Sequence, residues 1–391
     1  MMLGFLLARA GVSVVVLEKH GDFLRDFRGD TIHPSTLELM HELGLLDEFL
    51  KRPHQELSQL SGVVGGMPVT LADFSHLPTR CKFIAFMPQW DFLNFLAQQA
   101  SRYTTFKVLM NAEATSLIEK DGRVTGIQAT TPEGPMEVLA DLVVGADGRR
   151  STIREAAGFK TVNLGAPMDV LWMRLSKQAD DPHQALGYID RGHILVTIDR
   201  GDYWQCAFVI PKGATEQIKT RGMGAFRNEI AQIAPFLRER LTELAGWDDV
   251  KLLTVVVDRL ERWYKPGLLC IGDAAHAMSP VGGIGINIAV QDAVAAANIL
   301  AGPLSAGVLG PEHLQQVESR RSFPMRATQS MQLLVQNRVI RTVLASNERL
   351  SPPFAVKMLQ RWPYLRRIPA RLIGMGFRPE HVHTPKRDTG S

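Results

Sequence analysis

The 391-residue sequence contains only three cysteines, Cys81, Cys206 and Cys270, and they lie far apart. None belongs to a CxxC pair or lies beside a histidine-rich stretch, so the spacing predicts neither a zinc site nor a disulfide framework. We therefore expect no metal, and a reducing, cytoplasmic environment. A chain of this length with 45% hydrophobic residues can bury a sizeable core without such cross-links.

Long uninterrupted apolar runs are also missing. The longest uncharged stretch, residues 293–311, contains asparagine, glycine and proline, which a bilayer-spanning helix avoids at such density. The apolar start of the chain has no basic region before it, so no signal peptide is predicted. The sequence has no internal repeat and no low-complexity tract, and we expect no transmembrane segment.

Most of the chain carries little net charge. The formal charge is +4, whereas residues 351–391 carry eight Lys or Arg against two Asp or Glu. The remainder is therefore slightly acidic, which argues against a nucleic-acid partner. Apolar residues between the tail arginines leave two alternatives: a helix packed on the FAD domain, which we favour, or a basic amphipathic surface for peripheral membrane contact. Pro363 and Pro369 exclude one long helix lying on a membrane.

The beginning of the chain has the pattern of the second half of a nucleotide-binding unit. The apolar segment 1–10 predicts a helix that ends at Gly11, and the β-branched run 12–17 predicts a buried strand followed by Glu18. In dinucleotide-binding folds a carboxylate at this position binds a ribose, although an exposed glutamate after any strand gives the same pattern. The strand and glycine-rich turn that precede such a helix are missing, so we expect an intact unit to have roughly ten more residues before Met1.

Two further motifs lie far along the chain. One is the turn from Gly145 to Arg154, with the sequence Gly-Ala-Asp-Gly-Arg-Arg-Ser-Thr-Ile-Arg. The other runs from Gly272 to Asn287 and combines Gly-Asp-Ala-Ala-His with a proline- and glycine-rich loop. In their order along the chain, these motifs and the one at Glu18 resemble those of the group A flavoprotein aromatic hydroxylases, the p-hydroxybenzoate hydroxylase-like FAD monooxygenases. The resemblance covers most of residues 1–315.

The resemblance implies an α/β protein. Its parts are a Rossmann-like FAD-binding domain truncated at its N-terminus, an inserted antiparallel β-sheet substrate domain, and a C-terminal helical extension. Alternating polar and apolar residues over 170–210 agree with a sheet that has one covered face. The expected boundaries are 1–60, 88–165 and 259–315 for the FAD-binding domain, 61–87 and 166–258 for the substrate domain, and 316–391 for the extension.

The resemblance also implies FAD as cofactor, with NADH or NADPH as co-substrate. Asp273 matches the carboxylate that binds the ribityl chain, and the glycines let the backbone approach the flavin ring. The helix after Gly285 would direct its positive N-terminus at the reduced flavin. The cofactor-binding residues that follow from the resemblance are Glu18, Arg28, Gln89, Asp147, Gly148, Gly272, Asp273, Pro280, Gly282, Gly283, Gly285, Ile286 and Asn287.

Several side chains keep two interpretations. Arg28 and Gln89 are either flavin contacts or structural residues, and Arg154 either closes its turn or faces the pyrophosphate. We interpret His276 as a packing residue rather than a metal ligand. No catalytic residue is assigned, because six side chains of the predicted sheet suit an aromatic pocket and core packing equally well: Trp172, Arg174, Tyr188, His193, Trp204 and Cys206.

The implied reaction is hydroxylation of an aromatic or polyketide-like small molecule. NAD(P)H reduces FAD, and the reduced flavin reacts with dioxygen to a C4a-hydroperoxide that passes its terminal oxygen to the substrate. A non-oxygenating reductase of the same fold and a flavin-free remnant that acts as a binding protein are the alternatives. The sequence has no nucleophile-elbow serine constellation, and it does not predict the oligomeric state.

Overall fold

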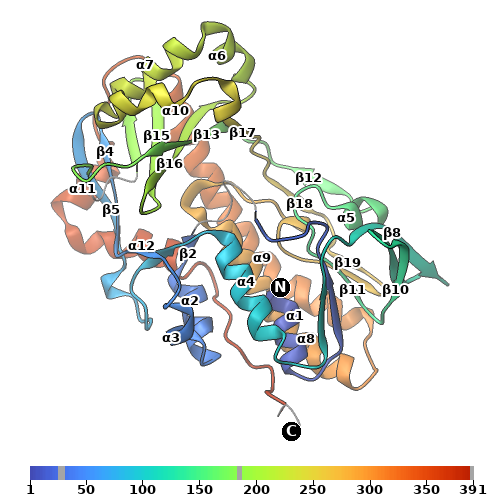
Figure 1. The fold of residues 1–391 in the computed structure, drawn as a ribbon. Coiled ribbons are helices and arrows are strands. Elements are labelled where there is room, and N and C mark those ends of the chain that lie inside the picture. The colour runs from blue at the N-terminus through green and yellow to red at the C-terminus, as the bar shows by residue number, and fades with distance from the viewer. Residues whose placement is uncertain (25–30, 183–186, 388–391) are drawn as a thin grey trace.

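The computed structural model describes residues 1–24, 31–182 and 187–387. A broad β-sheet covered by helices forms one end of the molecule, and short parallel strands packed with long helices form the other (Figure 1). This arrangement is the α/β architecture expected from the sequence. The glycine-rich loop of residues 280–285 lies between the two parts, because its Val281 packs against the broad sheet while its other residues contact the helical part.

Short parallel strands form the nucleotide-binding part. Helix α1 (Met2–Arg9) leads into β1 (Val14–Leu17), as the sequence predicts, and a Cβ on Gly4 would lie 2.9 Å from Val16 Cγ2. Gly4 therefore allows α1 to pack closely on its strand. Within the described residues, the strands fall into two groups that share no backbone ladder, β1 with β7 (Phe106–Leu109) and β11 (Val143–Gly145) with β20 (Leu268–Cys270) and β19 (Tyr264–Lys265).

Helix α8 (Gly285–Ser305) is the central helix of the core. It packs between α1 and α9 (Pro311–Val335), and its alanines allow close contact with both. The apolar stretch Val281–Ser305 is long enough to cross a membrane, but 72% of its apolar window is buried inside the molecule. Its hydrophobicity is therefore explained by its position in the core.

The broad sheet has seven strands and draws them from two separate parts of the chain. All neighbouring strands are antiparallel except β14 and β4, which are parallel. Two adjacent glycines in a strand-like stretch predict a hairpin at Gly65-Gly66. The structure confirms it, since this turn joins β4 to β5. In spatial order the strands are β17 (Lys251–Leu253), β13 (Met168–Ser176), β16 (Tyr203–Pro211), β15 (His193–Asp199), β14 (Gly187–Asp190), β4 (Gln59–Val64) and β5 (Met67–Asp73).

The two faces of this sheet are covered by different parts of the protein. Helices α6 (Thr215–Arg221) and α7 (Met223–Ile233) pack on one face (Figure 1). The opposite face contacts α10 (Arg341–Leu344) and Val281 of the glycine-rich loop. Because side chains alternate between the faces of a strand, a residue's position along the strand decides whether it lies toward the loop or away from it.

The C-terminal segment is helical only as far as Gly374. Helices α11 (Phe354–Arg361) and α12 (Arg367–Gly374) lie against the edge strand β5. Beyond Gly376, which has φ +72°, the chain has no helix or strand through residue 387 and runs back to α1, where the Arg387 amide donates to the Arg9 carbonyl at 3.0 Å. We call residues 376–387 the strap.

The remaining elements connect these layers. They are β2 (Thr31–Ile32), α2 (Pro34–Glu42), α3 (Leu46–Phe49), β3 (Gln55–Leu57), β6 (Ile84–Phe86), α4 (Gln89–Ala100), β8 (Glu113–Lys120), β9 (Arg123–Thr131), β10 (Gly134–Leu139), α5 (Thr152–Ala156), β12 (Thr161–Asn163) and β18 (Asp258–Leu260). The helical period of residues 226–244 predicts a helix over that range. Its second half is instead the 3₁₀ stretch Pro235–Glu243, because Pro235 cannot donate the backbone hydrogen bond that would continue the helix.

Candidate functional site

Two of the sequence motifs meet at the ends of β11 and β20. Gly145 pairs with Cys270 in the parallel ladder, and the Ile271 amide donates to the Gly145 carbonyl at 3.0 Å. Immediately beyond the ladder, Nη2 of Arg149 lies 3.8 Å from Oδ2 of Asp273. The Asp147-Gly148 turn and the Gly272-Asp273 turn are therefore side by side at the carboxyl edge of the strands, where α/β proteins bind ligands.

The first turn is fixed by its own side chains. The Asp147 carboxylate accepts hydrogen bonds from the Ser151 hydroxyl and, at 3.1 Å, from the Ile153 amide, while Ser151 caps α5. Arg154 is buried and donates to the Arg149 carbonyl, with Asp258 as its ion-pair partner. Of the two interpretations of Arg154, the structure therefore supports closure of the turn.

The second turn requires glycine at its first position. Gly272 has φ +59°, and a Cβ added there would lie 3.0 Å from the Cβ of Ala289 in α8. Its amide donates to Oδ2 of Asp292 at 3.1 Å. The turn leaves the neighbouring Asp273 side chain 34% exposed, so that its carboxylate is accessible to a ligand.

A buried charge network lies behind this turn. Oδ2 of Asp292 lies 2.6 Å from Nε2 of His276, and Oδ1 accepts from Nε of Arg321 at 2.9 Å. Arg321 Nη1 lies 3.1 Å from Oε1 of Glu380, so the strap also belongs to the network. Burial raises the pKa of Asp292, but His276 and then Arg321 outweigh that effect and hold the pKa below its usual value.

His276 is part of this network and also packs on an aromatic ring. Its imidazole is buried, with its centroid 4.9 Å from that of Trp263. In the part of the chain that the structure describes, no group of three or more His, Cys, Asp or Glu side chains is arranged to hold a metal. The contacts with Trp263 and Asp292 show that His276 packs on a ring and forms a hydrogen bond, as the sequence predicts.

The glycine-rich loop is tied to β2. Gly282 and Gly283 have φ +77° and +62°, and a Cβ on Gly283 would collide with Oγ1 of Thr31. The same Thr31 hydroxyl donates to the Gly283 carbonyl at 2.8 Å. Position 283 therefore requires glycine for two reasons: its backbone is left-handed, and it lies too close to Thr31 for a side chain. Pro280 and Gly285 bound the loop, and Gly285 is the first residue of α8.

The Asn287 amide holds the loop from the other side. Its Nδ2 donates to the Thr31 carbonyl at 3.0 Å, and its Oδ1 accepts from the His33 amide at 2.9 Å and the Thr36 hydroxyl at 2.8 Å. With both ends of the side chain engaged in the protein, any cofactor contact of Asn287 would come from its backbone. The neighbouring Ile286 is half-buried in the first turn of α8.

His33 connects the loop region to the C-terminal helices. Its Nδ1 lies 2.7 Å from the carbonyl of Ile373 in α12, and the ring has no exposed surface. Burial lowers the pKa of His33 to about 4, which the backbone carbonyls of Ile373 and Gly282 only partly offset. The imidazole is therefore neutral near pH 7.

Three further residues are predicted from the sequence to bind the cofactor. Glu18 follows β1, which belongs to the other strand group, and its Oε1 accepts from the His20 amide at 3.0 Å. Gln89 is the first residue of α4 rather than a residue of the preceding loop, since Pro88 is a favourable helix start. Arg28 lies outside the described residues. For all three, cofactor contact stays a prediction.

The aromatic side chains of the seven-stranded sheet divide between its faces. Tyr188, Trp204 and Cys206 belong to the core under α6 and α7, and His193 stacks on Phe208 of the same core. An aromatic pocket over the loop is therefore wrong for these four, and burial raises the pKa of Tyr188 to about 12. Trp172 instead packs in the cluster that contains Val281 of the loop.

Arg174 follows Trp172 by two residues and is exposed on the same face. Its guanidinium lies 3.7 Å from the centre of the Tyr203 ring, and it forms an exposed ion pair with Asp202. These contacts hold the Arg174 side chain at the surface. Of the six side chains that the sequence suggests for a pocket, Trp172 is therefore the one that packs on the loop side of the sheet.

Sequence reasoning missed several residues that hold the site: Thr31, His33, Asp292, Arg321 and Glu380. Asp292 had a signal, since it is the single charged residue of the 21-residue helix α8, and a lone carboxylate in an apolar helix needs a buried partner. Arg321 and Glu380 gave no comparable signal, because both lie in polar segments of the sequence.

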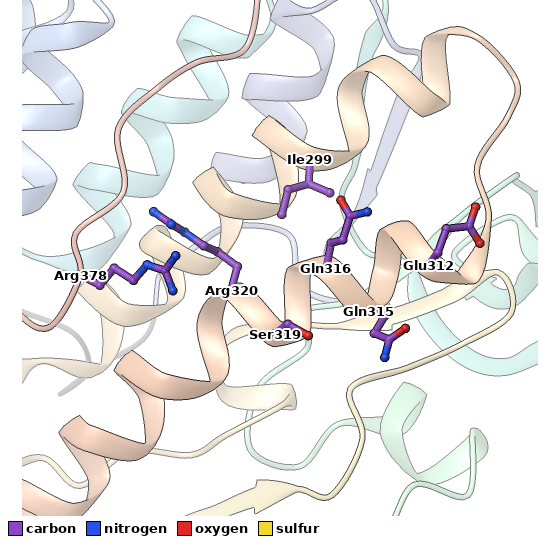
Figure 2. Close-up of a pocket in the computed structure, with 7 residues that line it drawn as sticks. All are labelled: Ile299, Glu312, Gln315, Gln316, Ser319, Arg320 and Arg378. Carbon is purple, nitrogen blue, oxygen red and sulfur yellow. The ribbon is translucent and has the colours of Figure 1, made fainter.

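One surface hollow lies away from these turns. It has a volume of about 580 Å³ and is lined by α8 and α9 residues together with Arg378 of the strap (Figure 2). Ile299 in its wall is 14 residues from the start of α8, or roughly 20 Å along the helix. Arg320, which also lines it, already pairs with Glu380, and this hollow is distinct from the turns described above.

Comparison with known proteins shows the family of the chain. Residues 1–331 match the family model described as an FAD binding domain. The chain belongs to this FAD-binding family. It is 29% identical over 375 residues to 6-methylpretetramide 4-monooxygenase of Streptomyces rimosus, covering 95% of this chain and 88% of that protein. It is also 29% identical to the 12-dehydrotetracycline 5-monooxygenase/anhydrotetracycline 6-monooxygenase of Streptomyces rimosus subsp. rimosus, covering 82% of this chain and 64% of that protein.

Solved structures of FAD-dependent monooxygenases share the fold. PqsL of Pseudomonas aeruginosa, a probable FAD-dependent monooxygenase, superposes with a TM-score of 0.74 at 20% identity, covering 88% of this chain and 94% of that one. The anhydrotetracycline hydroxylase OxyS of Streptomyces rimosus gives 0.71 at 23% identity, covering 95% and 73%. The FAD-dependent hydroxylase family inferred from the sequence motifs is thereby confirmed.

The residues present fit FAD. Gly272 and Gly283 present backbone where a side chain would collide with the protein, so a flat ring system can approach the chain closely. Asp273 has a partly exposed carboxylate that suits a ribityl hydroxyl, and α8 begins at Gly285 without a side-chain cap on its first amides, which are donors that suit an anion. FAD bound here would supply hydride acceptance from NAD(P)H and activation of dioxygen.

Proposed function

We propose that the protein is an NAD(P)H-consuming FAD monooxygenase that hydroxylates an aromatic or polyketide-like small molecule. The observation that carries this proposal is the contact between the glycine-rich loop and the broad sheet. Val281 of the loop packs in one cluster with Trp172 and Val196, on the face of that sheet that lies opposite α6 and α7. An FAD held by the loop would thus have its ring beside an apolar, aromatic-bearing surface.

The residues of the chain have separate tasks in this proposal. Asp273 would bind the ribityl chain, and Asp147, Gly148 and Gly272 would keep the two turns in register. Pro280, Gly282, Gly283 and Gly285 would follow the flavin ring with their backbone. The first amides of α8, at Ile286 and Asn287, would stabilise the negative charge of the reduced flavin.

The apolar face of the sheet would also keep water away from the reaction. Trp172, Ile194 and Val209 lie on it, and they would exclude water from the oxygen-reactive edge of the flavin while an aromatic substrate is held. Aromatic and aliphatic surfaces bind planar carbon-rich molecules without specifying charge, which agrees with a polyketide-like substrate. The relatives named above as tetracycline-type monooxygenases support this substrate class.

The test is oxidation of NADH and NADPH by the FAD-loaded full-length protein, with and without candidate phenols and polycyclic ketones. We expect substrate-stimulated oxidation and a product that gains one oxygen atom from ¹⁸O₂, detected by mass spectrometry. A non-oxygenating reductase would oxidise NAD(P)H and reduce the substrate without incorporating ¹⁸O. Oxidation that yields only free hydrogen peroxide with every candidate would contradict hydroxylation of this substrate class.

A further inference from the structure

The outer surface of α11, α12 and the turn between them exposes large apolar side chains. Phe354 is 77% exposed, Trp362 44%, Tyr364 61% and Ile368 59%. Across the described residues, three of the four exposed aromatic side chains belong to this segment; the fourth is Phe323. A monomer rarely gathers such side chains at its surface without a binding role.

The inner side of these helices is already occupied. Gln360 of α11 accepts from the Thr70 amide at 3.2 Å and donates to the Thr70 carbonyl at 2.8 Å, so it covers the edge of β5. In α12, Ala370 is buried in a cluster with Phe74 and Leu77. The two helices are therefore held in place by the sheet, and the exposed aromatic side chains are not needed for that contact.

The same surface is purely basic. Residues 351–379 contain six Lys or Arg and no Asp or Glu. Lys357, Arg361 and Arg371 are exposed, and none of them forms an ion pair with a described residue. We call the exposed set the tail patch: Phe354, Lys357, Arg361, Trp362, Tyr364, Arg367, Ile368 and Arg371.

The positive charge of the tail patch distinguishes between two partners that could cover it, a second copy of this chain and an anionic lipid surface. In a symmetric dimer the patch would face its own copy, and the like charges would repel each other across the interface. An anionic lipid surface binds both the basic and the aromatic side chains of the patch. It attracts the arginines, and Trp, Tyr and Phe side chains lie favourably at the level of the headgroups. Figure 1 shows α11 at the margin of the molecule, where a flat surface can reach it.

We propose that the tail patch docks the protein on an anionic membrane surface. The helices would lie on the membrane and not cross it, since each has only eight residues and they are separated by Pro363. The sheet edge β5 carries both helices, so docking would hold the broad sheet at a fixed distance from the lipid. An enzyme held in this way can receive an apolar substrate directly from the bilayer.

The first experiment is co-sedimentation of the full-length, FAD-supplemented protein with vesicles. We expect binding to vesicles of phosphatidylcholine mixed with phosphatidylserine, weaker binding at high salt, and little binding to phosphatidylcholine alone. Trp362 should shift its fluorescence to shorter wavelength on the mixed vesicles, and Trp362→Phe should remove that shift. Absence of binding to the mixed vesicles at low salt would overturn the proposal.

Paired variants test the two components of the patch. Arg361→Gln with Arg371→Gln should weaken binding to the mixed vesicles about thirtyfold, from about fivefold per arginine. Phe354→Ser with Ile368→Ser should weaken it about tenfold, because the apolar area that enters the headgroup region is lost. The matched controls, Arg238→Gln with Lys251→Gln and the exposed Leu139→Ser, should bind as the parent does.

Thermal unfolding and NAD(P)H oxidation in solution should be unchanged in all these variants, since no altered residue belongs to the proposed flavin site. If the control pair lost as much binding as the patch pair, the attraction would be one of net charge only and the proposal would be wrong. Equal binding to polyglutamate, unaffected by Phe354→Ser, would indicate an acidic protein instead. A dimer in light scattering that the patch variants dissolve would assign the surface to a second copy.

Discussion

The buried carboxylate of Asp292 lies 2.6 Å from Nε2 of His276 and at the same time accepts the Gly272 amide at 3.1 Å. One side chain of α8 thus sets both the turn that carries Asp273 and the histidine four residues after Gly272. Arg321 completes the charge balance on the other oxygen of the carboxylate. The position of the cofactor turn therefore depends on a charge that never contacts solvent.

Replacing Asp292 should be severe for this reason. Asp292→Asn keeps the size of the side chain but removes the carboxylate charge that Arg321 and His276 share, and Glu380 then remains as the buried carboxylate beside Arg321. Breaking a buried ion pair in this way costs up to about 3–5 kcal/mol of unfolding free energy. Urea unfolding followed by circular dichroism measures the loss. Asp202→Asn is the matched control, because Asp202 is exposed on a turn, and it should change stability by less than about 0.5 kcal/mol. A small effect of Asp292→Asn would show that the network carries little stability.

Removing the carboxylate of Asp273 and removing that of Asp147 should have different effects on FAD affinity and stability. Asp273→Ala should weaken FAD binding by about tenfold to a hundredfold, the loss of a charge-assisted hydrogen bond, and leave stability unchanged. Asp147→Ala should also cost about 1 kcal/mol of stability, because its carboxylate holds the Ser151 cap of α5. FAD titration by fluorescence quenching and thermal unfolding separate the two effects. Unaltered FAD affinity in Asp273→Ala would remove Asp273 from the proposed site.

Gly283 offers a steric test of the loop. Gly283→Ala places a methyl group against the Thr31 hydroxyl at a positive φ, so the loop must move and FAD affinity should fall at least about tenfold. Gly224→Ala is the control: it lies in α7 with open space around it and should be neutral or stabilise the helix by up to about 1 kcal/mol. Parent-like FAD affinity of Gly283→Ala would show that the loop tolerates a side chain.

Acid should destabilise the fold partly through His33. Its pKa is lowered to about 4 in the folded protein, so between the ordinary value of about 6.5 and pH 4 the unfolded chain binds the proton that the folded chain does not. Stability is therefore full above that window and falls by up to about 3 kcal/mol as the pH decreases to 4. Urea midpoints across this range should decline less steeply in His33→Gln. Parallel declines for both proteins would contradict the assignment.

Variants of Trp172 and Trp204 should distinguish an effect on substrate binding from an effect on the stability of the core. Trp172→Phe lies on the loop side of the sheet and should change the KM for an aromatic substrate more than the unfolding temperature. Trp204→Phe lies under α6 and α7, where its Nε1 donates to Asp181 at 2.6 Å; it should lower stability by about 1–3 kcal/mol and leave KM unchanged. Steady-state kinetics and calorimetry on both variants provide the comparison.

The sequence predicted the elements whose formation depends on residues that are neighbours in the chain. The helix before Gly11, the strand before Glu18 and the hairpin at Gly65-Gly66 each follow from residues that are neighbours in the chain, and the structure contains all of them. The glycines from 282 to 285 also indicated a close backbone approach, which the contact of Gly283 with Thr31 explains.

The sequence could not indicate which face of a strand each aromatic side chain occupies. Tyr188 and Trp172 both alternate with apolar neighbours, yet they lie on opposite faces because α6 and α7 cover only one of them. Nor could it show that Glu380 reaches Arg321, since that contact depends on the path of the strap across the finished core. Tertiary contacts of this kind have no periodicity in the sequence.

The strap gives the folding of this protein a definite order in time. Glu380 completes the ion pairs around Arg321, which in turn balances the carboxylate that sets the Gly272-Asp273 turn. During synthesis the ribosome must release residue 380 before that arrangement can close. A nascent chain therefore cannot complete this arrangement before the strap has emerged, so the proposed coenzyme site closes only after the strap has docked.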